Sequence, residues 1–361
     1  MSGGASPSRR ATQKEVAQRA GVSQAVVSQV LNGRSGAIRL TSETRGRVLE
    51  AMRELGYVPN IAARSLAGGR NHLLGVFSSE PVFPTDTRDF YYPFLEGIED
   101  AAAALDYDLL LHTRPAAAAD ERQGYRQTRS RLTLADGTLM LGELGDHSRR
   151  AEVARLLSEG HRMVFVGRRE LPGLELTWVG ADYAAATVQA TRALLEAGHT
   201  RLLYLGGMRH GESALDRETG FWRALDSGGT GRALRTQAQD IAPALVQTLR
   251  ADGCTGLLIE NDALALRWLE VAESLGLRAP LDYSFAVLGD PVTPLPLPRS
   301  WAAFRIPRRA MGVQAVRLLD GLVRGLEAPS LLMPCDWHAG DSIGPPPQRK
   351  PGRWSDKMSS A

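Results

Sequence analysis

The sequence has few of the features that mark secreted, membrane-spanning or metal-binding proteins. Only two of its 361 residues are cysteines, Cys254 and Cys335, so we expect neither a disulfide framework nor a cysteine-based metal cluster. No apolar run approaches the roughly 18–20 residues that a membrane-spanning helix needs. The stretch MSGGASPSRRATQKE at the N-terminus lacks the apolar segment of a signal peptide. These absences predict a cytoplasmic protein without a membrane partner.

The signatures of several enzyme classes are also missing. A phosphate-binding loop needs a lysine directly after a glycine, and the only lysines, Lys14, Lys350 and Lys357, follow other residues. The chain contains no G-x-S-x-G, no H-E-x-x-H and no paired C-x-x-C motif. His199 lies in Gly198-His199-Thr200, which is typical of a structural turn before a strand. We therefore predict a protein that is not an enzyme and that uses no cofactor or metal.

What the sequence does have is an uneven distribution of charge. Residues 1–70 contain 11 Lys/Arg and 4 Asp/Glu, a net charge of +7. The other 291 residues contain 32 basic and 36 acidic side chains, a net charge of −4. A basic head on a slightly acidic body indicates a polyanionic partner at one end only. Charge alone leaves open a solvated basic tail.

Residues 12–56 carry the pattern of three short helices. Thr12 and Glu15 have the spacing of a capping box, and Gly21 ends the first helix that they begin. Ser23 can cap a second helix over residues 24–31, and a third helix runs from about residue 41 until Gly56 stops it. Two short helices joined by a glycine-containing turn are a helix-turn-helix. The apolar residues at helical spacing are Val16, Ala17, Ala20, Val27, Val30, Leu31, Val48, Met52 and Leu55.

The outward face of the second helix favours DNA binding over an ordinary solvated surface. The N-terminal end of a recognition helix enters the major groove and needs short amide and hydroxyl side chains there. Gln24 and Gln29 can make paired hydrogen bonds to adenine, and Ala25 can contact a thymine methyl group. Three more polar side chains suit contacts to phosphates, namely Ser23, Ser28 and Asn32.

The head resembles the DNA-binding head of the LacI/GalR regulators in the segments EVAQRAGVSQAVVSQVLNG and TSETRGRVLEAMRELGYVPNIAARSLAGGR. The shared features are, in order, the A-G-V-S step, the V-S-x-V-L-N ending, the E-L-G-Y-x-P-N start of the hinge and the A-R-x-L segment. The resemblance implies base reading by Gln24, Ala25 and Gln29. It also implies a hinge helix over about residues 60–67, formed on DNA, whose Leu66 wedges into the minor groove. The other DNA contacts expected from the head and hinge are Thr12, Asn60 and Arg64.

One loop of the head departs from the family pattern. The chain is longer than usual between Asn32 and Glu43, around residues 37–39. Arg34 and Arg39 in this loop can add contacts to phosphates.

From residue 72 onward, short apolar runs alternate with amphipathic helical stretches. This alternation predicts parallel sheets covered by helices on both faces. Two such halves make two lobes, and ligands of open α/β sheets bind at the carboxyl ends of the strands, hence in a cleft between the lobes. The predicted strands are residues 73–77, 107–111, 138–141, 163–166, 202–205, 256–259 and 285–288, and the predicted helices are residues 93–105, 120–132, 148–159, 183–197, 241–251 and 262–275.

The body resembles the periplasmic-binding-protein-like body of the same family in FLEGIEDAAAALDYDLLL, LLEAGHTRLLYLGG, RETGFWRAL, ENDALALRWLEVAESLGLRAP and MGVQAVRLLDGLV. The resemblance implies an effector site made of an aromatic pair, an arginine three residues before Gly220, an Asn-Asp step after one strand and an acidic residue after another. Such groups suit the hydroxyls and the apolar face of a sugar or a similar polar metabolite. The residues at these positions are Phe90, Tyr91, Arg217, Asn261, Asp262 and Asp290.

Other roles stay open for several of these residues. Arg217 can instead be a salt-bridged scaffold residue. Asn261 and Asp262 can simply cap the helix that follows them. Asp290 stands between Gly289, where an aromatic residue is common in the family, and Pro291.

Two further departures concern the body. Gly167 stands where the family often has an acidic residue. The stretch of residues 227–240 is short and rich in glycine, which leaves one strand and loop of the second lobe in doubt.

The expected architecture is an all-α helix-turn-helix head with a hinge helix, followed by a two-lobed α/β body of doubly wound parallel sheets. The predicted parts are a disordered N-terminus (1–10), the DNA-binding domain (11–58), the hinge helix and linker (59–70), the effector-binding and dimerisation domain (71–343) and a disordered tail (344–361). The tail lacks leucine heptads, so we expect a homodimer rather than a tetramer.

The sequence thus predicts a regulator of transcription that binds double-stranded operator DNA. We expect a repressor that binds a palindromic operator as a homodimer and responds to a sugar-like effector in the cleft. The alternatives are a regulator that also activates, or one whose cleft no longer binds a ligand. A transport binding protein shares the two-lobed body, but it would need an export signal and would have no use for the basic head.

Overall fold

The computed structural model describes residues 11–32, 40–57, 70–78, 90–112, 132, 134–144, 147–226, 228–290 and 300–347. The chain forms two compact units, one of residues 1–73 with 129–136 and the other of residues 74–128 with 137–361. The predicted hinge helix, the loop at residues 37–39 and nearly all of the predicted helix over residues 120–132 lie outside the described residues.

The head consists of α1 (Gln13–Ala20), α2 (Gln24–Asn32) and α3 (Ser42–Glu54). The predicted capping box is present, because Thr12 Oγ1 accepts a hydrogen bond from the Glu15 amide at 3.3 Å and Glu15 Oε2 accepts one from the Thr12 amide at 2.7 Å. Gly21 follows α1 with φ of 63°, the left-handed conformation that glycine adopts without steric cost. These two signals fix both ends of α1.

A small apolar core holds the three helices together. Val16, Val27 and Val48, one from each helix, are fully buried against one another. Ala51 joins this core, whereas Leu55 at the end of α3 is exposed. An ion pair between Arg19 and Glu54 at 2.5 Å also links α1 to α3.

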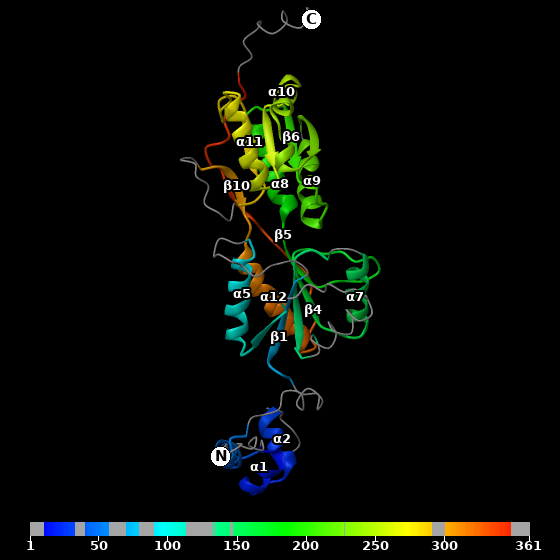
Figure 1. Cartoon of the computed structure of the whole chain (residues 1–361), viewed down its shortest axis with the longest axis vertical. Coiled ribbons are helices and arrows are strands. Elements are labelled where there is room, and N and C mark those ends of the chain that lie inside the picture. Colours follow the sequence, from blue (N-terminus) through cyan, green and yellow to red (C-terminus); the bar gives the residue numbers. More distant parts are fainter. Residues whose placement is uncertain are drawn as a thin grey trace, which may run out of the picture. The chain divides into compact units, whose positions relative to one another are not determined.

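The described residues of the body form two six-stranded sheets (Figure 1). The first sheet has the order β11-β5-β4-β3-β1-β2, and we call it, with its helices, the first lobe. The strand pairings from β1 through β3, β4 and β5 to β11 are all parallel. The elements of this lobe are β1 (Leu73–Ser78), α5 (Tyr92–Ala104), β2 (Asp108–His112), β3 (Gly137–Leu141), α7 (His147–Ser158), β4 (Met163–Val166), β5 (Trp178–Ala181), α12 (Arg308–Val323) and β11 (Leu331–Met333).

The second sheet, the centre of the second lobe, has the order β12-β10-β9-β8-β6-β7. Its strands are parallel except for β12, which pairs antiparallel to β10 at the edge. The elements of this lobe are α8 (Tyr183–Glu196), β6 (Arg201–Gly206), α9 (Glu212–Leu225), β7 (Thr230–Arg235), η1 (Ala238–Asp240), α10 (Pro243–Ala251), β8 (Gly256–Ile259), α11 (Asp262–Ser274), β9 (Ser284–Val287), β10 (Ala302–Arg305) and β12 (Asp336–His338).

Helices cover both faces of the second sheet, and its strands therefore carry apolar side chains on both sides. Leu202 and Tyr204 belong to one core cluster, which includes residues of α8 and α9. Leu203 and Leu205, which alternate with them, belong to a second cluster, which includes residues of α10 and α11. Successive side chains of a strand point to opposite faces, so the near-continuous apolar runs of the sequence correspond to a sheet covered on two sides.

The predicted α/β class is confirmed, and most predicted elements have the expected bounds. β4 and β8 coincide with the predictions, and β2 and β9 differ from them by one residue at each end. The doubt about residues 227–240 is resolved, because β7 pairs with β6 over its whole length. The sequence patterns did not predict β5, β10, β11 or β12.

Among the described elements, the chain crosses between the two lobes three times. It passes from β5 to α8 at Asp182, from β10 to α12 at Ile306, and from β11 to β12 at Cys335. Asp182 N donates a hydrogen bond to Met333 O at 2.7 Å, which ties the first crossing to the third. Each lobe is therefore built from separate parts of the sequence.

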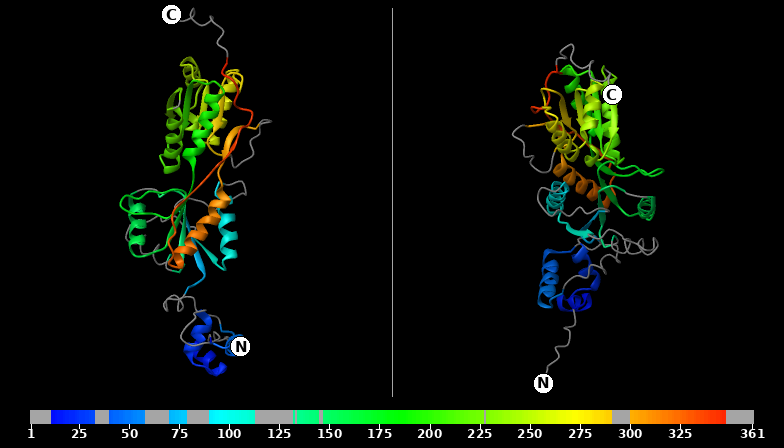
Figure 2. Two further views of the ribbon diagram at one scale, coloured as in Figure 1. Left: turned by 180° about the vertical axis from the view of Figure 1, so that it is seen from behind. Right: turned by 45° about the horizontal axis from the view of Figure 1, so that its top comes forward.

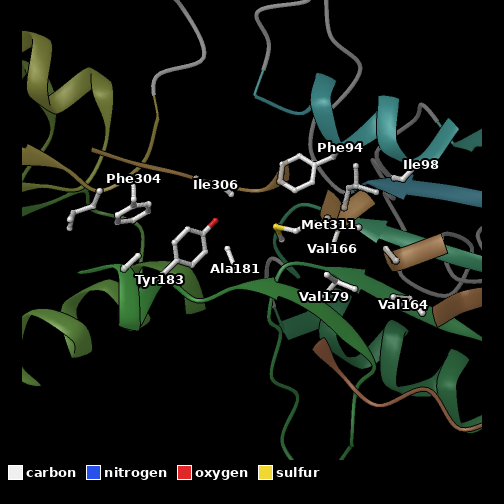
Figure 3. Packing of buried hydrophobic residues seen from close by; sticks show 14 of the residues in the cluster. Phe94, Ile98, Val164, Val166, Val179, Ala181, Tyr183, Phe304, Ile306 and Met311 are labelled. Atoms are coloured by element: carbon white, nitrogen blue, oxygen red, sulfur yellow. The ribbon is translucent and has the colours of Figure 1, made fainter. Parts of the chain in front are cut away.

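The buried cluster of the first lobe continues along these crossings into the second. Figure 3 shows Tyr183 beside Phe304 and Ile306, with Met311 between them and the side chains of the first lobe. The Tyr183 and Phe304 rings lie 6.3 Å apart, centroid to centroid. The crossings thus form part of the core.

Helices α5 and α12 lie side by side on one face of the first sheet, as all views in Figures 1 and 2 show. Their close approach depends on two glycines that face the opposite backbone. A Cβ on Gly97 would lie 2.0 Å from Arg309 O, and one on Gly312 would lie 2.3 Å from Phe94 O. A side chain at either position would require the helices to separate.

Among the described residues, no helix is both long and apolar enough to cross a bilayer.

Candidate functional site

The exposed end of α2 is the first candidate site. Ser23 Oγ accepts a hydrogen bond from the Val26 amide at 3.4 Å and so caps the helix as predicted. Ser23, Gln24 and Ala25 are exposed, while Val27 on the opposite face is fully buried. The start of α2 therefore presents amide, hydroxyl and methyl groups to the surroundings.

The other predicted DNA contacts have different settings. Ser28 and Gln29 are half-buried. Thr12 is exposed, with its hydroxyl engaged in the capping box. Asn32 is the last residue of α2. The remaining predicted contacts lie outside the described residues, and they are Arg34, Asn60, Arg64 and Leu66.

The second candidate site lies beside the crossings between the lobes, where Arg217 is buried. Arg217 projects from α9 and is only 8% exposed. Its Nε donates to Leu288 O at 2.7 Å and its Nη1 donates to Ser213 O at 3.0 Å. The guanidinium carbon lies 3.8 Å from the centroid of the Tyr183 ring and 5.9 Å from that of Phe304. Backbone carbonyls and aromatic faces thus hold this cation.

Asp290, two residues after Leu288, is held by an arginine that the sequence patterns did not single out. Arg308 Nη1 lies 2.7 Å from Asp290 Oδ2, and the Ile306 amide donates to Asp290 Oδ1 at 2.9 Å. Arg308 is 6% exposed, and its guanidinium lies 4.7 Å from the Phe90 ring centroid. Arg308 thereby joins two predicted effector residues, Phe90 of the first lobe and Asp290 of the second.

Asn261 has the capping geometry that was the alternative to ligand binding, whereas Asp262 is the first residue of α11 and, among the described residues, bonds only to the next amide. Asn261 Oδ1 accepts from the Leu264 amide at 3.0 Å, and Asp262 Oδ1 accepts from the Ala263 amide at 3.0 Å. Within the described part of the chain, no hydrogen bond or ion pair joins either residue to Arg217 or Asp290. Tyr91 packs its ring edge against Phe90, with the centroids 5.1 Å apart.

Of the two arginines after β4, Arg168 links the lobes and Arg169 bonds within the first lobe. Arg168 makes two parallel hydrogen bonds to Asp216 of α9, with Nε–Oδ2 of 2.9 Å and Nη2–Oδ1 of 2.7 Å. Burial alone would lower the pKa of Arg168, but the carboxylates of Asp216 and Glu170 raise it above its ordinary value. Arg169 donates twice to Gly142 O, at 3.1 and 2.8 Å. In the sequence, only the Arg-Arg step directly after Gly167 pointed to the contact of Arg168 with α9.

A small cavity in the second lobe is unconnected with these residues. Apolar core side chains line it, among them Trp268, Leu249 and Leu257, together with Tyr283 and Cys254. None of the predicted effector residues lines it.

Comparison with known proteins identifies the family. Residues 12–60 match the family model described as bacterial regulatory proteins, lacI family, and residues 191–343 match the periplasmic binding protein-like domain. The HTH-type transcriptional regulator GntR of Pseudomonas aeruginosa is 30% identical over 331 residues, which cover 88% of this chain and 91% of that protein. This chain belongs to the LacI/GalR family.

Solved structures confirm the fold of this LacI/GalR regulator. The lac repressor dimer bound to operator and the anti-inducer ONPF has a TM-score of 0.66 and 21% identity, over 93% of this chain and 100% of that one. The complex of the transcriptional regulator CelR with cellobiose has a TM-score of 0.61 and 24% identity, over 92% and 100%. The predicted family and the prediction of a transcription regulator rather than an enzyme are confirmed.

Proposed function

We propose that this LacI/GalR regulator is a repressor that binds a palindromic operator as a homodimer and is controlled by a small polar, sugar-like effector bound between the lobes. The observation that carries the proposal is the exposed N-terminal end of α2 in a capped helix-turn-helix. A second candidate role, activation, has no feature of its own in the described residues.

The DNA contacts proposed for the head follow from the chemistry of base edges. Gln24 and Gln29 offer an acceptor and a donor to adenine, and Ala25 offers a methyl group to thymine. Thr12, Ser23, Ser28, Asn32, Arg34, Asn60 and Arg64 are proposed to contact the backbone, and Leu66 to enter the minor groove. The dimer in the similar lac repressor structure supports two-fold binding, because two heads related by symmetry read two inverted half-sites.

The effector site is proposed around Arg217, Asp290 and the aromatic pair Phe90 and Tyr91. These residues come from both lobes and lie at or near the points where the chain crosses between them. A ligand that touches both lobes can favour one arrangement of the body over another by its difference in affinity for the two. Asn261 and Asp262 are proposed to line the second-lobe side of the same site. The cellobiose complex of a similarly folded regulator supports a sugar-like ligand.

Selection of binding sites from a random DNA pool tests the operator proposal. We expect a two-fold motif whose affinity falls by orders of magnitude between about 50 and 200 mM salt, because two basic heads displace counterions from several phosphates. Gln29→Ala should relax the preference at one position of the half-site at a cost of about 1–3 kcal/mol.

The matched control is Gln18→Ala, which removes an exposed glutamine of α1 in the same head. It should leave the selected motif unchanged. A selection that returns no two-fold motif would contradict the proposal, and so would identical motifs for the wild type and Gln29→Ala.

A further inference from the structure

The carboxylate of Asp136 binds three successive backbone amides where the chain enters β1. Asn71 N donates to Asp136 Oδ1 at 2.8 Å and to Oδ2 at 3.0 Å. His72 N and Leu73 N both donate to Oδ2, at 2.8 and 3.4 Å. These amides precede Asp136 by 63–65 residues, so the carboxylate joins two distant segments of the chain rather than capping its own.

Two further hydrogen bonds strengthen this contact. Asp136 N donates to Leu73 O at 2.7 Å, and Asn71 Nδ2 donates to Leu134 O at 2.9 Å. Asp136 directly precedes β3, which pairs with β1, the strand that begins at Leu73. The position of the carboxylate is therefore defined by two neighbouring strands of the first sheet.

His72 has a backbone conformation that residues with a Cβ rarely adopt. Its φ is 56°, in the left-handed region, where Cβ crowds the backbone. Among the described residues other than glycine, only Asp106 shares a positive φ. A left-handed residue can turn successive N–H groups toward one side, and such a concave row of donors binds an anion. The negative charge of Asp136 thus stabilises a conformation that is unfavourable for His72 by itself.

This conformation lies at the end of the predicted hinge. The hinge and linker were expected over residues 59–70, and Asn71 follows them directly. A linked module reaches fewer positions when the base of its linker has a single conformation, and less conformational entropy is then lost when the module binds. The contacts of Asp136 therefore bear on where a head can reach DNA.

From these contacts we propose that Asp136 is a positioning residue for operator binding, which fixes the start of the hinge and so restricts the spacing of the two half-sites that the dimer accepts. This inference rests on the proposed binding of a two-fold operator by a homodimer. The carboxylate acts through the backbone of residues 71–73 and not through a contact with DNA. Its loss should weaken binding to the best-spaced operator and make binding less sensitive to spacing.

The test uses the full chain and the operator obtained by selection from the random DNA pool. Dissociation constants are measured for this operator, for versions with one base pair inserted or removed at the centre, and for a duplex with a single half-site. Each base pair moves one half-site relative to the other by about 3.4 Å and rotates it by about 34°. The spacing ratio is the dissociation constant for an altered spacing divided by that for the selected operator.

Asp136→Ala removes all the acceptors of the side chain, and Asp136→Asn keeps one oxygen but loses the charge. Asp226→Ala is the matched control, because Asp226 is an exposed carboxylate elsewhere in the body. His72→Gly removes the exposed side chain of His72 and keeps the three amides.

We expect a spacing ratio of about ten or more for the wild type, Asp226→Ala and His72→Gly, because the second head is then misplaced. Asp136→Ala should bind the selected operator about three- to tenfold more weakly, with a spacing ratio about threefold or more below that of the wild type, and Asp136→Asn should be intermediate. Binding to the single half-site should agree within about twofold for all variants, because the start of α2 is unchanged.

The spacing ratio does not depend on the fraction of protein that is folded, so a purely structural role of Asp136 would leave it at the wild-type value. If Asp136→Ala is unfolded by circular dichroism, Asp136→Asn decides. A wild-type spacing ratio in every folded Asp136 variant would overturn the inference. A wild type that binds all spacings equally would do the same, and so would a ratio for His72→Gly as low as that of Asp136→Ala.

These outcomes are distinct from failure of the proposed function. A wild type that prefers one spacing, together with Asp136 variants that keep this preference, contradicts only the positioning role. A wild type that binds no two-fold DNA site contradicts the proposed function and this inference with it.

Discussion

The side chain of His199 connects the second sheet to the segment that follows β12. It is 1% exposed, with Nδ1 2.8 Å from Thr255 Oγ1 and Nε2 3.0 Å from Gly344 O. A carbonyl only accepts hydrogen bonds, so Nε2 carries the hydrogen and the Thr255 hydroxyl donates to Nδ1. Both ring nitrogens are satisfied by the neutral form, as expected for a structural residue.

Burial lowers the pKa of His199 below its ordinary value of 6.5, although the hydrogen bond to Gly344 opposes this shift. The unfolded chain therefore takes up a proton at a higher pH than the folded chain. The contribution of His199 to stability is present above about pH 6.5 and is lost as the pH falls toward the folded-state pKa.

We predict that the stability advantage of the wild type over His199→Gln shrinks as the pH falls from 7 to 5. Urea unfolding at each pH measures it. His210→Gln, at an exposed histidine, should keep the wild-type pH dependence. A constant difference between the wild type and His199→Gln would show that His199 does not titrate in this range.

Single residues of the candidate site could be predicted, but their partners could not. The family resemblance singles out Arg217, three residues before Gly220, and the structure buries it; its role as an effector residue stays a prediction. Nothing in the sequence around Arg308 marks it as the partner of Asp290, because pairing across two lobes depends on how the chain crosses between them. The capping roles of Thr12, Ser23 and Asn261 were predictable because they depend only on the next three residues.

At the scale of elements, α5 and α12 pack closely because the glycines at their contact have no side chain. Gly312 faces the backbone of Phe94 and Ile98, and the Cβ of an alanine would lie 2.3 Å from Phe94 O and 3.0 Å from Ile98 N. Backbone atoms cannot move aside as the end of a flexible side chain can. The two helices would have to separate, with loss of packing along the whole contact.

We predict that Gly312→Ala lowers the free energy of unfolding by about 1–3 kcal/mol, as overpacking of a tight contact does. The control lies on the same helix. Gly321 has nothing within 4 Å of its Cβ position. Gly321→Ala should therefore raise the free energy of unfolding by about 0.5–1 kcal/mol, because alanine favours the helix. Urea denaturation of both variants measures the contrast, and losses of similar size would contradict it.

The elements that the sequence did predict are those with long apolar runs or strong end signals. β8 has four consecutive buried residues, with a turn at Gly253 before it and the N-cap Asn261 soon after it, and its bounds were predicted correctly. β11 and β12 have three residues each and lie at sheet edges, so they are too short to show the alternation of a strand. β5, with the sequence WVGA, is too short to show a period of two. Edge and crossing strands are defined by their neighbours rather than by their own residues.

At the scale of the molecule, the pair Arg168–Asp216 joins the first lobe to α9 of the second lobe. Both side chains are largely buried, with exposures of 23% and 20%. Arg232–Asp252, in the second lobe, joins the same residue types at 3.6 Å with exposures of 56% and 52%. Water screens the second pair far more than the first.

We predict a coupling energy of about 1–2 kcal/mol for Arg168–Asp216 and of about 0–0.5 kcal/mol for Arg232–Asp252. Double-mutant cycles with Arg→Gln and Asp→Asn, followed by urea unfolding, measure both values. Coupling of equal size in the two pairs would show that the contact between the lobes contributes no more than a surface ion pair.

The three crossings also affect how the protein is made. The ribosome releases β1, β3 and β4 early, but the strand that completes their sheet, β11, and the helix that covers it, α12, lie at residues 308–333. Until then the nascent chain has no Met311, Val316 or Leu319 to cover the sheet. Chaperones therefore have a long period in which to bind this apolar surface. A premature stop codon before residue 308 removes α12 and β11. The apolar surface then stays exposed, and the truncated chain becomes a substrate for quality-control proteases.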